Sequence, residues 1–224
     1  MSALPVVEAR EVARTFGHGP ASVVAVHEVT CRLWAGDQVA MTGPSGSGKT
    51  TLLHLIGGLD QPTTGTISWP AIGEATSLRP GPVAVVFQGP SLLPALDIEE
   101  NVALPLLLQG LTRRDARHAA RQALARLALG ALAGKLPEEV SAGQAQRVAV
   151  ARALAGRPVL ILADEPTGQL DVGNATLVVD ALRDVARESG AALVLNTHDP
   201  RIAAQFDHHW SLVGGRLSDR TAAR

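Results

Sequence analysis

The stretch Gly43 to Thr50, which reads GPSGSGKT, follows the apolar run Val39-Ala40-Met41 and opens a helical pattern. Glycine lets the backbone turn so that successive N–H groups face one centre, and the N-terminus of a helix adds partial positive charge. A buried strand, a glycine-rich loop and a helix in this order form a cradle for phosphate groups. The stretch therefore predicts a P-loop core. Its binding residues are expected to be Gly43, Pro44, Ser45, Gly46, Ser47, Gly48, Lys49, Thr50 and Thr51.

Lys49 stands out because lysine is rare in this chain. Of the twenty basic residues, two are lysine, Lys49 and Lys135, and the other eighteen are arginine. A compact ammonium fits against the β and γ phosphates of a nucleotide, whereas a guanidinium is planar and bulkier. The neighbouring Thr50 offers a hydroxyl oxygen to Mg²⁺. We interpret Lys49 as a phosphate ligand and Thr50 as a metal ligand.

The composition is that of a globular protein of one domain. The chain has 224 residues, 46% of them hydrophobic and 18% charged, with a net charge of -1. This net charge lacks the positive excess that is typical of nucleic-acid-binding domains, so nonspecific binding to DNA or RNA is not expected. The apolar runs fall short of the roughly 20 residues that a membrane helix needs, and the N-terminus lacks a signal-peptide core, so a cytoplasmic location is expected. Cys31 is the only cysteine, which excludes an intrachain disulfide and indicates a buried spectator thiol.

Short apolar runs alternate with helical patterns along most of the chain. Bounded by Gly, Pro or Asp, the runs predict buried strands of a parallel sheet at Gln38 to Thr42, Val83 to Phe87, Val159 to Ala163 and Ala192 to Asn196. The helical patterns cover Lys49 to Gly57, Thr112 to Leu129, Ser141 to Ala155, Asn174 to Ser189 and Pro200 to Gln205. This alternation predicts an α/β fold.

Two further segments modify this plan. Residues 6–33 alternate around a turn-prone FGHGP, and residues 65–82 are rich in Gly, Pro and Thr, so an antiparallel β portion is expected beside the parallel sheet. The segment 89–136 carries helical character but no convincing strand. We therefore expect one domain over 1–224, with a core at 1–88 and 156–224 and an inserted α-helical subdomain at 89–155.

Two carboxylates follow the predicted strand that ends at Ala163. Asp164 and Glu165 stand where a buried strand reaches the carboxyl edge of the sheet, which is where α/β sheets bind ligands. Asp164 is expected to hold Mg²⁺, directly or through water, and Glu165 to polarise the water that attacks the terminal phosphate. The alternative is an ordinary acidic turn after a strand.

Ser141 and Gln144 have the spacing of a capping box, in which each side chain bonds the backbone N–H of the other residue. By itself the pattern predicts the start of a helix. The same geometry also presents N–H groups to a phosphate. Both interpretations remain open on these residues alone.

The order of these motifs resembles that of the nucleotide-binding subunit of ATP-binding cassette (ABC) transporters. The decisive piece is Ser141-Ala142-Gly143-Gln144, which resembles the family's signature Leu-Ser-Gly-Gly-Gln and departs from it at Val140 and Ala142. The resemblance implies an ATPase with a RecA-like core that uses ATP and Mg²⁺. It also implies that Ser141, Gly143 and Gln144 face the γ phosphate of ATP held by a second copy, so that each ATP lies between two chains.

Four other residues match positions of the family's motifs. Gln88 resembles the Q-loop glutamine that senses Mg²⁺ and the γ phosphate, and His198 resembles the switch histidine that contacts the γ phosphate. Asp171 resembles the D-loop acid that reaches across the dimer, although Gln169 in the same loop is unusual. Phe16 falls where the family stacks an aromatic ring on adenine. Taken singly, each residue also has an ordinary structural explanation.

The run from Gln88 to Gly110 and the tetrapeptides Gly57-Gly58-Leu59-Asp60 and Glu165-Pro166-Thr167-Gly168 resemble the branch of lipoprotein-release, macrolide-efflux and antimicrobial-peptide permeases. The implied partners are ATP, an integral membrane permease and a second copy or a paralogous ATPase, without nucleic acid, at the inner face of the cell membrane. Two alternatives remain, a regulator of a membrane complex of the cell-division type and a module that binds nucleotide without hydrolysing it. ATPases of DNA repair insert long coiled coils, for which this sequence has no pattern.

Overall fold

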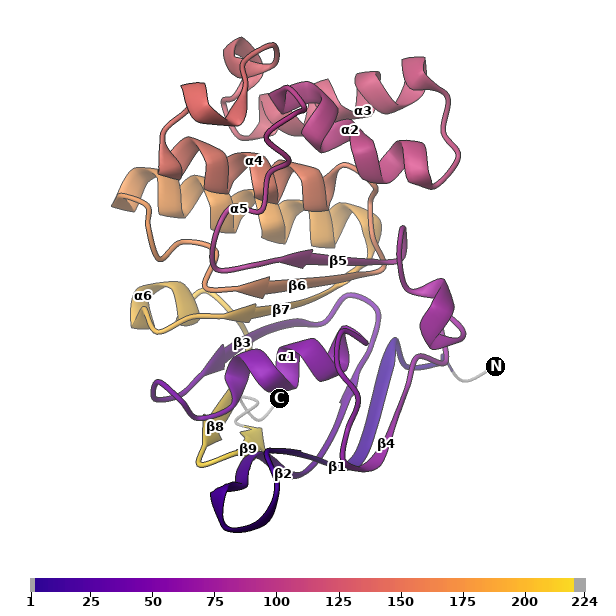
Figure 1. Ribbon diagram of the computed structural model, residues 1–224, viewed down its shortest axis with the longest axis vertical. Coiled ribbons are helices and arrows are strands. Elements are labelled where there is room, and N and C mark those ends of the chain that lie inside the picture. Colours follow the sequence, from indigo (N-terminus) through magenta and orange to yellow (C-terminus); the bar gives the residue numbers. More distant parts are fainter. Residues whose placement is uncertain (1–2, 220–224) are drawn as a thin grey trace.

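The computed structural model of the protein describes residues 3–219, and its centre is a six-stranded sheet (Figure 1). The strands are β3 (Gln38–Thr42), β5 (Val83–Val86), β6 (Leu160–Asp164), β7 (Ala192–Asn196), β8 (His208–Val213) and β9 (Arg216–Asp219). Their order is β5-β6-β7-β3-β8-β9, and all neighbours are parallel except β8 and β9. The four parallel strands predicted from apolar runs are therefore confirmed.

Helices cover both faces of this sheet (Figure 1). They are α1 (Lys49–Ile56), α2 (Ile98–Leu108), α3 (Arg113–Arg126), α4 (Ala142–Leu154), α5 (Val172–Ser189) and α6 (Pro200–Ala203). In the view of Figure 1, α4 and α5 lie above the sheet with α2 and α3 beyond them, and α1 lies below it.

Alternating side chains divide the strands between two hydrophobic cores. Ile161 and Leu193 belong to the core that the sheet shares with α2 to α5. Leu160 and Val194 belong to the other core, which the sheet shares with α1 and the N-terminal strands. Successive residues of a strand point to opposite faces. Burial of both faces explains why these strands read as continuous apolar runs.

A second, antiparallel sheet packs against α1. It consists of β1 (Val7–Phe16), β2 (Val23–Leu33) and β4 (Thr64–Ser68) in the order β2-β1-β4. The antiparallel portion expected from the sequence is confirmed. Cys31 on β2 is buried, and burial raises the pKa of its thiol to about 12. The thiol therefore stays protonated, as a spectator does.

The strand β8 has no counterpart among the ranges expected from the sequence, whereas α2 lies in the segment 89–136, which was expected to be helical but without defined helix bounds. β8 reads HHWSLV, and only its Trp210 and Leu212 are buried, so the strand lacks an apolar run. It reaches β9 through Gly214 and Gly215, both at positive φ, as a two-residue hairpin turn requires. α2 contains Pro105 within a run of apolar residues, which hides its helical period.

An ion-pair cluster joins α2 to α3. Glu99 of α2 is only 3% exposed, and its carboxylate accepts hydrogen bonds from Arg117 and from Arg121 Nε, the latter at 2.6 Å. Burial by itself would raise the pKa of Glu99, but the bonds from Arg121 and Arg117 outweigh it and lower the pKa below its usual value. The cluster holds the first two helices of the helical region together.

Replacing Glu99 by Gln is expected to lower the free energy of unfolding by about 1–3 kcal/mol, because the buried negative charge is lost and one of the two acceptor oxygens becomes an amide donor. Because folding lowers the pKa of Glu99, the stability that its ionised carboxylate contributes is fully present above the pKa of the unfolded state. This stability is lost as the pH falls through the pKa of the folded state. Urea unfolding at neutral pH and below about pH 4 measures both effects. Glu138→Gln, at an exposed position, is the matched control. An equal loss for both variants would contradict the assignment.

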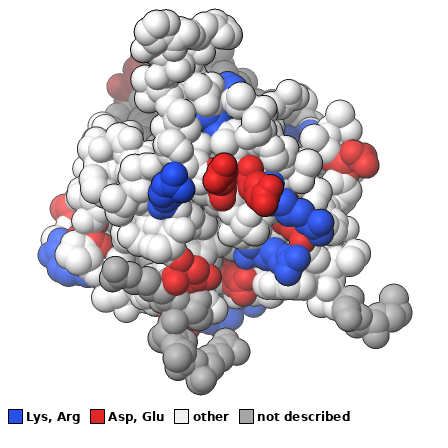
Figure 2. Space-filling view, turned by 90° about the horizontal axis from the view of Figure 1, so that it is seen from below, with Lys and Arg blue, Asp and Glu red and all other residues white. Residues whose placement is uncertain are grey.

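The surface carries charges of both signs. On the face seen from below in Figure 1, basic and acidic side chains lie close together among uncharged ones (Figure 2). Within residues 3–219, no helix combines the length and the hydropathy needed to cross a bilayer.

Candidate functional site

The glycine-rich loop connects β3 to α1 and requires glycine at two points. A Cβ on Gly43 would lie 2.0 Å from Leu212 O, and one on Gly48 would lie 2.0 Å from Ala25 O. Both residues have positive φ, 153° and 97°. The loop therefore cannot carry a side chain at Gly43, where it passes β8, or at Gly48, where it passes β2. The helix α1 begins at the next residue, Lys49.

Two side chains of the loop are buried in a way that suits an anion. Lys49 is 7% exposed, and its Nζ donates to Gly43 O at 2.8 Å and to Pro44 O at 2.9 Å. Ser47 is 6% exposed, and its Oγ has no hydrogen-bond partner within residues 3–219. Buried polar atoms normally have a partner. An ammonium and an unpaired hydroxyl at the N-terminus of a helix fit a phosphate group.

The carboxyl edge of the sheet brings three polar side chains together. Thr50 Oγ1 donates to Asp164 Oδ2 at 2.7 Å, and Asn196 Nδ2 donates to Asp164 Oδ1. Asp164 and Asn196 end the neighbouring strands β6 and β7 and are paired in register. Asp164 is 5% exposed. A buried carboxylate beside a hydroxyl oxygen is a donor set that suits Mg²⁺.

Glu165 follows β6 and adopts an uncommon backbone conformation. Its φ is +44°, and its N–H donates to Asn196 O at 3.0 Å. His198 Nδ1 lies 3.2 Å from Glu165 Oε2. Non-glycine residues at positive φ are uncommon and concentrate at functional sites. The backbone of Glu165 is thus tied to the end of β7, and its carboxylate lies beside His198.

A pocket of about 370 Å³ contains most of the predicted site residues. Its volume lies within the range of small-molecule sites, about 300–1,000 Å³. Phe16, which is 43% exposed, and Gln88 line it from β1 and from the end of β5. The remaining lining residues are Ala25, Ser45, Gly46, Ser47, Gly48, Lys49, Thr50, Thr51, Asp164, Glu165 and Asn196.

The residues of the SAGQ motif, Ser141 to Gln144, do not line this pocket. Ser141 Oγ accepts from Gln144 N at 3.2 Å, and Gln144 Oε1 accepts from Ser141 N at 2.9 Å, so the predicted capping box is formed. Asp171 caps α5, and hydrogen bonds from Asn174 lower its pKa. A Cβ on Gly143 would lie 3.3 Å from Leu170, which places the two helix starts next to each other. None of these residues of the second group lines the pocket of the glycine-rich loop in its own chain.

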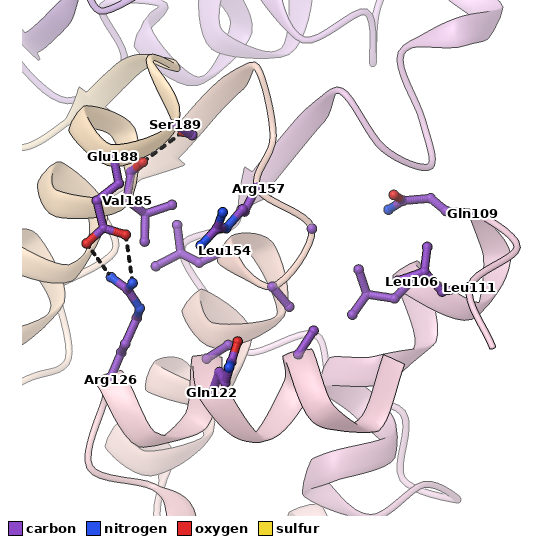
Figure 3. A pocket seen from close by; sticks show the side chains of 14 residues that line it. Leu106, Gln109, Leu111, Gln122, Arg126, Leu154, Arg157, Val185, Glu188 and Ser189 are labelled. Carbon is purple, nitrogen blue, oxygen red and sulfur yellow. Dashed lines mark hydrogen bonds and ion pairs between the residues drawn. The ribbon is translucent and has the colours of Figure 1, made fainter. Parts of the chain in front are cut away.

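Another pocket lies between α3 and α5, away from these residues (Figure 3). Arg126 and Glu188 form a bidentate pair at its side, with distances of 3.0 and 2.7 Å. None of the predicted site residues lines it.

Comparison with known proteins identifies the family. A protein-family model described as ABC transporter matches residues 26–168. This chain belongs to the ABC transporter family. It is 41% identical over 220 residues to the lipoprotein-releasing system ATP-binding protein LolD of Bordetella pertussis, and 95% of each chain is covered. It is 39% identical to the uncharacterized ABC transporter ATP-binding protein Rv0986 of Mycobacterium tuberculosis, over 97% of this chain and 90% of that protein.

Solved structures agree with this assignment. The ATP-binding cassette MJ0796, described as a dimer in a post-hydrolysis state bound to ADP and Pi, matches with a TM-score of 0.87 and 33% identity, over 95% of this chain and 98% of that one. The ABC protein binds and hydrolyses ATP and energises a membrane permease. The predicted fold class and the predicted lipoprotein-release branch are confirmed.

Two polar contacts of the ABC protein were not expected from its sequence. Asn196 holds Asp164, and its only sequence signal is its place at the end of an apolar strand. Gln146 is 1% exposed, and its Nε2 donates to Phe87 O at 3.0 Å, so α4 contacts the residue before Gln88. Gln146 follows the SAGQ motif closely. It links that motif to the segment that carries Gln88.

Proposed function

We propose that this ABC ATPase binds ATP together with Mg²⁺ in the pocket of the glycine-rich loop. The contact between Thr50 Oγ1 and Asp164 Oδ2, at 2.7 Å, carries the proposal. It places two oxygen ligands beside the N-terminus of α1, where N–H groups and the helix dipole favour phosphate. Gln88 supplies a third oxygen from the same pocket. Mg²⁺ bound there neutralises charge that develops on the phosphates.

Lys49 and the loop amides hold the phosphate chain in this proposal. The Lys49 ammonium already donates to two loop carbonyls, so it is oriented across the loop before nucleotide arrives. On binding, its donors turn to the β and γ phosphates. Such charge-assisted bonds are stronger than those to neutral carbonyls. Phe16 stacks on the adenine at the other end of the pocket.

Glu165 acts as the general base and His198 positions it. The carboxylate orients the attacking water and accepts its proton as the water attacks the γ phosphorus. His198, 3.2 Å from Glu165 Oε2, restrains the carboxylate and contacts the γ phosphate. Positioning of this kind and electrostatic stabilisation together account for most of the catalysis of phosphoryl transfer.

The site becomes complete when a second copy or a paralogous ATPase docks. Ser141, Gly143 and Gln144 lie outside the pocket of their own chain, yet they begin a helix whose N–H groups suit a phosphate. We propose that they face the γ phosphate bound by the partner and that Asp171 crosses the interface. The dimeric state described for MJ0796 supports this arrangement.

Ser141→Asp tests the composite site, because aspartate keeps the helix cap but sets a negative charge against the partner's γ phosphate. ATP binding to the single chain should be unchanged within about twofold, whereas ATP-dependent dimerisation and turnover should fall by about 100-fold or more. Size-exclusion chromatography with ATP and phosphate release measure these effects. Thr112→Asp, at the N-cap of α3, is the matched control. Wild-type dimerisation of Ser141→Asp would refute the proposal.

The permease would contact the ATPase at a groove separate from the pocket that Gln88 lines. An apolar groove runs between β5 and α2, and Leu108 in it is 67% exposed. We propose that a cytoplasmic segment of a permease of the lipoprotein-release branch docks there, which places the ATPase on the inner face of the membrane. The core at 1–88 and 156–224 would then hold ATP, and the helical subdomain at 89–155 would move with the permease.

A further inference from the structure

Phe16 has a fixed partner on one face of its ring. The guanidinium carbon of Arg14 lies 4.5 Å from the ring centroid. Phe16 itself is 43% exposed and lines the nucleotide pocket. One face of the ring is therefore covered by a cation.

Arg14 is held in turn by Asp60. Its Nε donates to Asp60 Oδ2 at 2.8 Å, and the two side chains are 26% and 27% exposed. An ion pair with about three quarters of each side chain buried is screened less than a surface pair. Asp60 also accepts from Gln61 N at 2.8 Å, so the carboxylate is fixed on both sides.

The loop that carries Asp60 connects the C-terminus of α1 to β4 and is bonded to β1. It follows α1, and Leu59 N donates to His54 O at 2.8 Å. Thr63 N donates to Ala13 O at 2.8 Å and Thr63 Oγ1 accepts from Thr15 N at 3.0 Å, which ties the loop to β1. These bonds do not involve the Arg14 side chain. Loss of the guanidinium therefore leaves the loop attached to β1.

We propose that the Arg14–Asp60 pair is a positioning device for the nucleobase, which fixes the Phe16 ring so that its other face receives the adenine. A ring held in place before binding loses less conformational freedom when the base stacks on it. Cation–π contacts of this geometry are favourable. Arg14 can act in this way only if Phe16 stacks on the base, as proposed above.

The experiment compares the full-length protein with Arg14→Met, which keeps the aliphatic stem and removes the charge. Dissociation constants for ATP and for inorganic triphosphate, which has no base, are measured by calorimetry. We expect ATP to bind roughly three- to tenfold more weakly and inorganic triphosphate to bind unchanged. KM for ATP should rise in the same proportion with kcat unchanged. Arg14→Lys should recover part of the loss.

Arg10→Met is the matched control, because Arg10 lies on the same strand, pairs with Glu8 at 2.9 Å and lies outside the pocket. In Phe16→Ala, which should weaken ATP binding by itself, adding Arg14→Met should have no further effect. Equal weakening of ATP and inorganic triphosphate by Arg14→Met would show a merely structural role and overturn the inference.

Two other outcomes separate this inference from the function of Phe16. If Phe16→Ala weakens ATP binding but Arg14→Met does not, the positioning role of Arg14 is wrong and the stacking role stands. If Phe16→Ala binds ATP as the wild type does, the stacking role and the positioning role both fail. Thermal melting of each variant identifies a folding defect, and Asp60→Asn then supplies a second test with the same expected pattern.

Discussion

Glu165→Gln is expected to reduce ATP turnover by about 100- to 10,000-fold, the range that general base catalysis contributes. Glutamine has the shape of glutamate but cannot accept the proton of the attacking water. The substitution leaves the loop, Lys49 and the Thr50–Asp164 contact intact, so ATP should bind as before. Because the bound ATP is not consumed, the dimer around it should persist. Phosphate release and size-exclusion chromatography with ATP measure the two effects.

Glu188→Gln is the matched control for this prediction. Glu188 pairs with Arg126 in the pocket between α3 and α5 (Figure 3). None of the predicted nucleotide-binding residues lines this pocket. Glu188→Gln should keep wild-type turnover. If Glu165→Gln hydrolysed ATP at the wild-type rate, the assignment of Glu165 as general base would be wrong. The Thr50–Asp164 site for Mg²⁺ would not be affected by that result.

Lys49→Ala is expected to weaken ATP binding by about 100-fold, because hydrogen bonds to charged groups contribute roughly 1.5–3 kcal/mol each. In the free protein the ammonium bonds to two carbonyls of the loop, so its loss also removes a donor from Gly43 O and from Pro44 O, although Pro44 O still accepts from Ser47 N at 3.2 Å. Turnover should be lost together with binding. Calorimetry with ATP measures the first effect and phosphate release the second.

The chain offers a precise control for this change, because Lys135 is its other lysine. Lys135 is exposed, and Lys135→Ala should bind ATP as the wild type does. Thermal melting separates a loss of phosphate contacts from a loss of fold. ATP binding by Lys49→Ala that equalled that of Lys135→Ala would exclude Lys49 from the phosphate site.

The motifs could be found from the sequence because each one is local. Gly43 to Thr50 specifies a loop and a helix start within eight consecutive residues, and Asp164-Glu165 marks the end of a strand whose apolar run is visible by itself. The family's order of motifs then assigned roles to residues such as Phe16, Gln88 and His198. Those roles remain predictions, although the structure places Phe16 and Gln88 in the pocket and His198 against Glu165.

Contacts between distant segments could not be predicted in the same way. Asn196 and Asp164 are 32 residues apart, and Arg14 and Asp60 are 46 apart. Neither pair has a spacing that a local pattern could reveal. The half-buried strand β8 was also missed, because a strand that alternates polar and buried residues over six positions has little signal.

The amino-acid sequence by itself determined the P-loop, the parallel strands, the α/β class and the family, since these depend on backbone preferences and on burial of consecutive residues. Only the tertiary structure decided which side chains meet. It set Thr50 against Asp164, seated Arg14 over Phe16, and left Ser141 outside the pocket of its own chain. The physical reason is that strand order and helix packing, which no local pattern encodes, bring residues far apart in the chain within hydrogen-bond distance.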